Sequence, residues 1–368
     1  MLPVPLKALF ILMAMVHAMH KLPSGTEKQV LVRARSAIAY WSYQVVRSLN
    51  EDIAQEEKRA SDGTMTSVMM LLWADQQIQP SARWRFHYNG FIKMTQLRGG
   101  IEKLWNENPH LRIGIMTTVV IEIFANATSP SNDQLLELTH PLNFDFFRSV
   151  WGDGSLPVYI GSICPPALLF EVVEVNRLRA ASHLYPNNYN HQSQSQSQSQ
   201  SQFDDLEAQA QETLSRILSF SPEALANLHG KNERTRAHWL LIGRVHQSAI
   251  TLYCILSLQD VGLLPDNTAG FKSIVAVHYD RLLINLREGL RHDNFRNCLL
   301  WPLVVAGVGA GTNGSAFERD FVAGELAAAV KEMGTAAPML AREVLKRFWS
   351  EGKMRWDECF DQPYLFIM

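Results

Sequence analysis

The side chains that could bind a metal ion are few and widely spaced in this sequence. The four cysteines stand at positions 164, 254, 298 and 359, so no two are close enough for a zinc finger, a zinc ribbon or a redox CxxC pair. His17 and His20 lie three residues apart and could share one helix face, but no third ligand can be assigned beside them. We therefore expect no metal site in this chain.

Residues 309–314 have the GxGxxG spacing of a dinucleotide-binding loop. In that fold a buried strand precedes the loop, and an acidic residue follows a second strand. Here Pro302 interrupts the preceding apolar run, and proline cannot donate to a central strand ladder. We instead predict a helix from about Pro302, then a glycine-rich loop, then a helix capped by Ser315 with Glu318 at its third position. No cofactor is expected.

Catalytic motifs are absent: the sequence contains no G-x-S-x-G elbow, no H-E-x-x-H zinc motif and no P-loop. His238 and His246 flank the most apolar helical stretch, where a hydrogen-bonded core histidine is the favoured interpretation. We therefore predict no catalytic residues and no enzyme activity. A helical enzyme with a pocket near these two histidines is one alternative, and a degenerate scaffold protein is another.

The composition is that of a globular protein without an excess of basic residues. Of the 368 residues, 47% are hydrophobic and 19% are charged, which excludes a collagen-like or wholly disordered chain. Lys and Arg number 34 against 36 Asp and Glu, giving a formal net charge of −2. Dedicated nucleic-acid binders carry a basic excess that neutralises phosphates, so direct DNA binding is not expected. Sparse cysteines are typical of reduced thiols in a cytosolic or nuclear protein.

Apolar residues recur at three- and four-residue spacing along most of the chain, which is the period of an amphipathic helix. The spacing predicts helices over 27–49, 64–78 and 84–97, the last ending at Gly99-Gly100, and over about 239–256, 274–290 and 340–349. Alternating strand patterns with hairpin turns are absent. We predict an all-α fold of stacked antiparallel helix pairs in one large helical domain.

The N-terminal residues have some features of a signal peptide, because Lys7 precedes the apolar stretch 8–16. No small-residue cleavage site follows, and the stretch is far shorter than the ~20 apolar residues that span a bilayer. We predict an amphipathic core helix here, with a secretory signal as the alternative. No membrane-spanning segment is predicted elsewhere.

Residues 191–202 read HQSQSQSQSQSQ, a polar low-complexity segment with nothing to bury in a core. With the preceding Pro- and Asn-rich residues, it predicts a disordered Ser/Gln insertion over 186–202. The insertion divides the domain (1–350) into an N-terminal helical half (1–185) and a C-terminal helical half (203–350). Residues 351–368 are predicted to form a C-terminal tail.

Two ordered clusters of residues resemble a known family. The first is Trp84-x-x-His87-x-x-Gly90 followed by Arg98-Gly99-Gly100, and the second is Trp301-Pro302 with Gly307, followed by Arg319 and Trp349. In this order they resemble the fungal-specific transcription factor domain. That domain is the regulatory middle homology region usually found C-terminal to a binuclear zinc cluster. The resemblance spans about residues 3–350.

The chemistry of these residues points to packing rather than catalysis. The tryptophans at 84, 301 and 349 can each bury on the order of 200 Å² in a helical core. The glycines at 90, 99 and 307 permit close approach of helices or a positive φ. Arg98 and Arg319 could cap carbonyl groups at helix C-termini or pair with carboxylates.

The resemblance implies the regulatory domain of a fungal transcription regulator that controls RNA polymerase II transcription in the nucleus, with the cytoplasm as an alternative location. Its implied partners are the transcriptional machinery or co-regulator proteins; a small-molecule effector and a homodimer are open alternatives. The family's six closely spaced cysteines are missing here. The chain therefore resembles a truncated zinc cluster protein or a stand-alone regulatory domain, and zinc is expected only if a missing N-terminal cluster exists.

Overall fold

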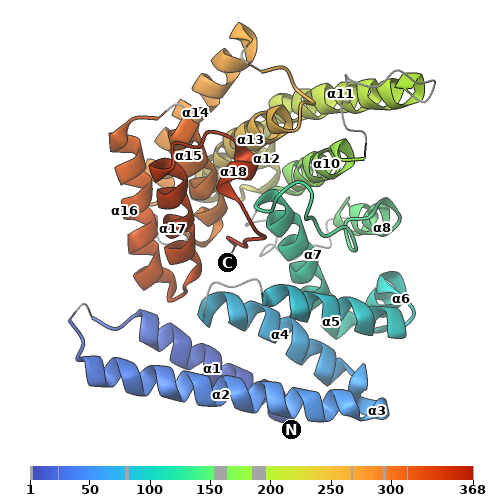
Figure 1. Ribbon diagram of the computed structural model, residues 1–368, viewed down its shortest axis with the longest axis vertical. Helices are drawn as coiled ribbons and strands as arrows, with labels where there is room; N and C mark the ends of the chain where they lie inside the picture. Colours follow the sequence, from blue (N-terminus) through green and yellow to red (C-terminus); the bar gives the residue numbers. More distant parts are fainter. Residues whose placement is uncertain are drawn as a thin grey trace. The chain divides into compact units, whose positions relative to one another are not determined.

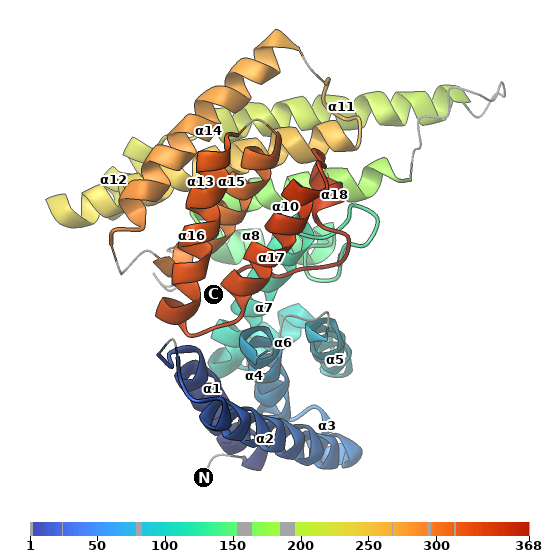
Figure 2. The same cartoon turned by 60° about the vertical axis from the view of Figure 1, so that its left-hand side comes forward.

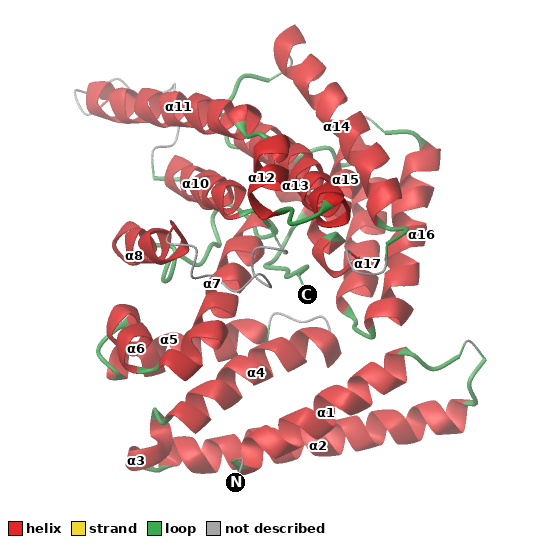
Figure 3. Ribbon diagram, turned by 180° about the vertical axis from the view of Figure 1, so that it is seen from behind, coloured by secondary structure: helices red, strands yellow, loops and turns green. Residues whose placement is uncertain are grey.

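The computed structural model describes residues 3–23, 25–78, 83–152, 164–184, 196–266, 268–292, 296–312 and 314–367. Every regular element within these ranges is a helix, as the colouring of Figure 3 shows. The all-α prediction is therefore confirmed. Consecutive helices pack against each other as pairs, for example α1 with α2, α4 with α5, and α13 with α14 (Figures 1 and 2).

The helices have the following bounds in chain order: α1 (Val4–His20), α2 (Lys28–Ala54), α3 (Glu56–Arg59), α4 (Asp62–Ile78), α5 (Trp84–Leu97), α6 (Ile101–Glu107), α7 (Arg112–Ala127), α8 (Pro141–Gly152), α10 (Pro166–Ser182), α11 (Gln196–Ser219), α12 (Pro222–His229), α13 (Glu233–Asp260), α14 (Ala269–Gly289), α15 (Leu300–Thr312), α16 (Ala316–Met333), α17 (Ala337–Ser350) and α18 (Trp356–Cys359). Short 3₁₀ helices, Pro109–Leu111 and Arg296–Cys298, precede α7 and α15.

Local signals set several helix ends where the sequence predicts them. Helix α5 spans Trp84–Leu97, and the two glycines that follow have φ angles of 88° and 99°, which L-residues with a side chain rarely adopt. Helix α16 begins after Ser315, whose backbone N–H donates to the Glu318 carboxylate at 2.7 Å. This bond is half of a capping box. Helix α2 runs past the predicted end at 49 as far as Ala54.

Two predicted loops are helical in the structure. Helix α15 continues through Gly307, Gly309 and Gly311, so the predicted glycine-rich loop is wrong over most of its length. The last part of the Ser/Gln segment, 196–202, forms the first turns of α11; residues 186–195 lie outside the described residues. Glutamine is a good helix former, and the apolar face of 203–219 stabilises a helix that extends backwards into the polar segment.

The chain forms two compact units, each built from segments that are distant in the sequence. The first unit comprises Met1–Ile121, His140–Phe146 and Gly324–Arg342. The second comprises Glu122–Thr139, Phe147–Ala323 and Glu343–Met368. These units do not follow the predicted division at the Ser/Gln segment, because each joins residues from both sides of it.

The core of the first unit includes the N-terminal helix. Leu9, Leu12 and Val16 of α1 are fully buried, and α1 packs on α2 and α4. The segment 324–342 completes this unit: the backbone N–H of Ala336 donates to the Gln77 carbonyl at 3.2 Å. The N-terminal stretch therefore serves as a core helix in this unit.

The two longest apolar helical stretches are also core elements. Pro109–Ala127 and Glu233–Asp260 are long and apolar enough to cross a membrane by length and composition. However, 78% and 72% of their most apolar windows are buried inside the structure. We therefore assign them to the protein core, where such apolar helices are common.

Candidate functional sites

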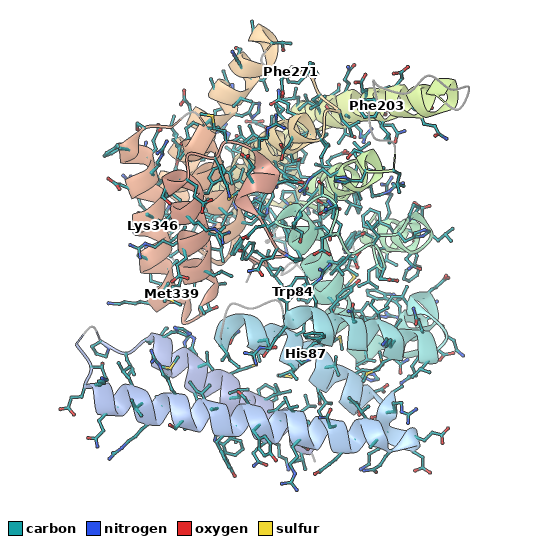
Figure 4. The ribbon with its side chains drawn as sticks, viewed as in Figure 1. Trp84, His87, Phe203, Phe271, Met339 and Lys346 are labelled. Atoms are coloured by element: carbon teal, nitrogen blue, oxygen red, sulfur yellow. The ribbon has the colours of Figure 1, made fainter. Side chains whose placement is uncertain are left out.

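The first cluster of motif residues lies on α5 and the turn that follows it (Figure 4). Trp84 is buried, and Nε2 of His87 lies 2.9 Å from the Asp75 carboxylate of α4. Gly90 has no close-packing role, because a Cβ there would make only an ordinary 3.9 Å contact with Val68. This cluster therefore holds α5 against α4.

Arg98, the next residue of the first cluster, makes several hydrogen bonds through its side chain. Its guanidinium donates to the Ala60 carbonyl at 2.8 Å, to the Asp62 carboxylate at 3.0 Å and to the Asn108 side chain at 3.0 Å. His110 adds a 2.7 Å contact to the same Asp62 carboxylate. Burial opposes ionisation of Asp62, but the hydrogen bonds from Arg98 and His110 hold its pKa below the ordinary value. Arg98 thus joins the start of α4 to the end of α6.

The second cluster lies on α15, α16 and α17. Trp301 is buried edge-on against Phe124 and Tyr253, with ring centroids 5.1 and 5.8 Å away. Pro302 is buried in the first turn of α15, where its missing N–H costs no hydrogen bond.

Close contacts then join the three helices of this cluster. A Cβ on Gly307 would overlap the Leu345 side chain of α17, and the Trp349 indole donates to the Gly307 carbonyl at 2.9 Å. Arg319 donates to the Ala310 carbonyl at 3.0 Å, near the end of α15. The motif residues therefore form two packing clusters, one in each unit. Within each cluster the side chains make packing contacts and hydrogen bonds, and they do not converge on a site that could catalyse a reaction.

A buried polar network of the second unit surrounds Arg179 of α10, a residue that sequence reasoning missed. Its fully buried guanidinium donates to the carbonyls of Asn126 and Ser129 at 3.0 and 2.8 Å, to the Tyr253 hydroxyl at 3.0 Å and to Asp357 at 2.6 Å. Only Asp357 among these partners carries a formal charge. Arg179 therefore connects α10 to α13 through the Tyr253 hydroxyl and to the C-terminal residues through a partly buried ion pair with Asp357.

Asp357 is held in its ionised form by this network. Burial opposes ionisation, but the Arg179 charge and hydrogen bonds from the Ser131 hydroxyl and backbone N–H keep the pKa of Asp357 below its ordinary value. Its own backbone N–H donates to the Asp260 carboxylate at 2.7 Å. Burial raises the pKa of Asp260.

The predicted C-terminal tail is wrong, because residues 356–367 complete the core of the second unit. Trp356, Phe360 and Phe366 are fully buried, and the Trp356 indole donates to the Ala127 carbonyl at 2.9 Å. The backbone N–H of Tyr364 donates to the Thr128 carbonyl at 3.1 Å. The aromatic content of this segment was the sequence signal that could have identified it as core, since aromatic side chains bury large apolar areas.

The candidate histidines and cysteines do not assemble into a reaction centre among the described residues. His246 is buried and contacts the Ile242 carbonyl of its own helix at 3.0 Å; His238 is half-buried beside His292. His20 contacts the Gln77 carbonyl at 3.1 Å. No group of three His, Cys, Asp or Glu in the described ranges could hold a metal ion. Burial raises the pKa of the Cys164, Cys254 and Cys359 thiols, which keeps them in the unreactive neutral form.

A cavity of about 690 Å³ lies in the second unit beside α13, α14 and the start of α16. Phe271, labelled in Figure 4, is one of its apolar residues. The cavity is lined by Leu256, Gln259, Asp260, Asp266, Phe271, Lys272, Val275, Ala276, Tyr279, Asp280, Thr312, Glu318, Met354 and Arg355. His238 and His246 are not among these residues.

Helix α2 has an exposed apolar face on the side opposite its buried one. Ile38, Val45 and Leu49 are buried, whereas Tyr40 and Tyr43 are 57% and 61% exposed. Val32 and Val46 extend the exposed face at helical spacing. We call the exposed side chains of Val32, Tyr40, Tyr43 and Val46 the α2 face. It is a candidate surface for another molecule, because clustered exposed apolar side chains mark interaction sites.

Comparison with known proteins shows which family this chain matches. The model of the "Fungal specific transcription factor domain" matches residues 2–367, which includes the segment predicted to be a tail. A relative from Leptosphaeria maculans, described as a "Phomenoic acid biosynthesis cluster-specific transcriptional regulator", is 32% identical over 371 residues. The match covers 100% of this chain and 66% of the relative, so the chain spans about two thirds of that protein's length. No solved structure matches the chain.

Proposed function

This chain belongs to the fungal specific transcription factor domain family, and from that premise we propose that it is the regulatory domain of a nuclear transcription regulator that acts through protein contacts. It influences RNA polymerase II transcription by binding a co-regulator rather than by reading DNA itself. The dispersed cysteines and the net charge of −2 favour an arrangement in which a separate module recognises DNA.

The α2 face is the observation that carries this proposal. Its inner side chains pack in the first unit, so the helix has a fixed support, while two tyrosines project from the outer side. Tyrosine is enriched at the centres of protein interfaces, because it combines a large apolar area with one polar group. A rigid helix with exposed tyrosines is therefore suited to binding a second helix.

The charges around the α2 face favour an acidic partner. Lys28, Arg33 and Arg35 are exposed on α2, and the sequence from 28 to 47 contains no Asp or Glu; Arg47 is already paired with Glu51 at 3.0 Å. Opposite charges steer association and fix its orientation, whereas a basic partner would be repelled. We therefore expect the partner to be an acidic amphipathic helix of a co-regulator.

A reporter experiment tests the proposal. Residues 1–368 are fused to a heterologous DNA-binding domain in a fungal cell, and reporter expression is compared with that of the DNA-binding domain alone. The fusion should change expression, and the double variant Tyr40→Ser/Tyr43→Ser should remove most of the change. Both side chains are exposed, so the fold should be retained, which circular dichroism and immunoblotting would check.

Phe86→Ser is the matched control. Phe86 is 75% exposed on α5 in the same unit but does not belong to the α2 face, so its loss should leave the reporter unchanged. A folded, nuclear fusion without a reporter effect would contradict the proposed function. An effect that survives the double tyrosine substitution would instead exclude the α2 face as the contact surface.

A further inference from the structure

A polar groove of about 550 Å³ lies in the second unit and is lined by residues from the start of α12, from α13 and from α14. Helix α13 packs against both other helices, and Figures 2 and 3 show the three together. Arg244 and Arg281 bring two positive charges to the described lining, against one negative charge on Glu223. Hydroxyl and amide side chains supply the other polar groups of the wall. A concave surface with a net positive charge and several hydrogen-bonding groups favours a small anion.

The guanidinium of Arg281 is a cation without a partner in the described part of the chain. It is exposed on α14 and makes no hydrogen bond or ion pair to the described residues. Arg244 is different, because it pairs with Glu223 at 2.9 Å. Both side chains of that pair are about half exposed, so the contact contributes little and can be exchanged. No carboxylate is available to Arg281 three or four residues away along its own helix, where the neighbours are Val277, His278, Ile284 and Asn285.

The Ser248 hydroxyl is the second group without a partner. Ser248 is only 3% exposed and lines the groove, yet its hydroxyl makes no hydrogen bond to the described residues and its oxygen is not sealed from solvent. Thr251, three residues further along α13, donates to the Gln247 carbonyl at 2.8 Å, but Ser248 makes no such bond to its own helix. A buried hydroxyl left unsatisfied is unfavourable and uncommon in native proteins. At the wall of the groove, this hydroxyl is a donor for a bound anion.

The start of α12 lines the same groove and is held against α13. The Gln247 side chain donates to three backbone carbonyls of the turn before α12, at 2.8–3.3 Å. A Cβ on Gly243 would lie 3.1 Å from the Pro222 side chain, so the first turn of α12 lies directly on α13. The Ser221 hydroxyl oxygen caps α12 by accepting the Ala224 N–H at 3.1 Å, and its hydrogen is then available to a ligand. Helix N-termini attract anions, because their N–H groups and dipole present partial positive charge.

We propose that this groove binds the carboxylate or phosphate group of a small polar molecule, with Arg281, the Ser248 hydroxyl and the Ser221 cap of α12 as its donors. The anion balances the Arg281 charge and accepts the hydrogen bond that Ser248 lacks. Arg244 joins the site when it exchanges its exposed contact with Glu223 for the ligand. This inference goes beyond the proposed protein contact on α2, because it adds a small-molecule site in the other compact unit.

Isothermal titration calorimetry on residues 1–368 tests the site with glucose 6-phosphate, gluconate and glucose. These probes share a polyol skeleton and carry a phosphate, a carboxylate and no charge, respectively. An ionic strength of about 0.15 M screens unspecific attraction between exposed charges. At least one of the two anions should bind saturably and about tenfold more tightly than glucose, because hydrogen bonds to a charged group contribute about that factor. The tighter anion then identifies the group that the site takes.

Two variants with a matched control separate binding from folding. Ser248→Ala should weaken anion binding by about tenfold. Its thermal midpoint should not fall, because alanine removes an unsatisfied polar group and is the better helix former. Arg281→Gln should weaken binding by about tenfold or more. Arg234→Gln removes an exposed cation of α13 outside the groove and should leave the affinity unchanged.

Removal of the competing carboxylate should have the opposite effect. Glu223→Gln frees Arg244 and removes the negative charge of the groove, so it should tighten anion binding by about threefold. Glu233→Gln makes the same change in net charge outside the groove and should leave the affinity unchanged. No saturable binding of either anion, equal affinity for glucose, or full affinity in Arg281→Gln or Ser248→Ala would overturn the proposal. None of these measurements uses the reporter, so either proposal can fail without the other.

Discussion

Replacing Gly311 by alanine should destabilise the protein by about 2 kcal/mol, although alanine is the better helix former. Gly311 lies in α15, and a Cβ there would overlap Cε1 of Phe348 and lie 3.0 Å from its Cδ1 and 3.2 Å from the Trp349 ring. Overpacking of a core costs about 1–3 kcal/mol. The Phe348 ring is fully buried, so we place the cost at the upper end, and the helix-propensity gain of about 1 kcal/mol offsets only part of it.

Urea denaturation of the full chain measures this difference against a matched substitution. Gly324 also lies within a helix, α16, but nothing stands within 4 Å of its added Cβ. Gly324→Ala should therefore stabilise the protein by about 0.5–1 kcal/mol. Gly311→Ala should lower the urea concentration at the unfolding midpoint and Gly324→Ala should raise it, and neither variant should change the m-value.

A second substitution tests whether the overlap with Phe348 causes the loss of stability in Gly311→Ala. Adding Phe348→Leu to Gly311→Ala should reduce the penalty of the alanine, because the smaller side chain makes room for its Cβ; a double-mutant cycle then gives a coupling energy of at least about 0.5 kcal/mol. If Gly311→Ala were as stable as Gly324→Ala, α15 would not approach Phe348 and the glycine-rich loop predicted from the sequence would be the better description.

The remaining predictions concern the charged groups of the second unit. Asp357→Asn should destabilise the protein by about 3 kcal/mol in urea melts, because it leaves the buried Arg179 charge unbalanced. Glu223→Gln, which breaks an exposed pair with Arg244, should cost less than about 1 kcal/mol, and equal costs for the two variants would refute the buried-pair argument. Burial, with the nearby Arg281 charge, lowers the pKa of His278 to about 4, so the folded state keeps this ring neutral while the unfolded state protonates it below about pH 6.5. Stability should therefore fall by about 3 kcal/mol as the pH drops from about 6.5 to 4, and His278→Leu should flatten that slope; an unchanged slope would show that other groups cause it.

The periodic and local features of this protein can be read from the sequence because they depend on neighbouring residues. Apolar spacing predicts the helices, Gly99-Gly100 marks the end of α5, and Ser315 with Glu318 marks the start of α16. Each signal acts within one or two turns of helix, where propensity and capping dominate. The all-helical fold follows from these signals alone.

Packing between segments that are distant in the sequence could be identified only from the tertiary structure. Glycine propensity predicts a loop over 309–314, yet Tyr279 and Phe348 pack on the bare backbone of α15 and keep Gly309 and Gly311 helical. Arg179 and Asp357 are 178 residues apart, and no local pattern indicates that the two charges meet in the core. The sequence by itself determines which segments become helices and which faces are apolar. Only the tertiary structure decides which of those faces meet, because that choice depends on shape and charge complementarity between side chains that no short window of sequence contains.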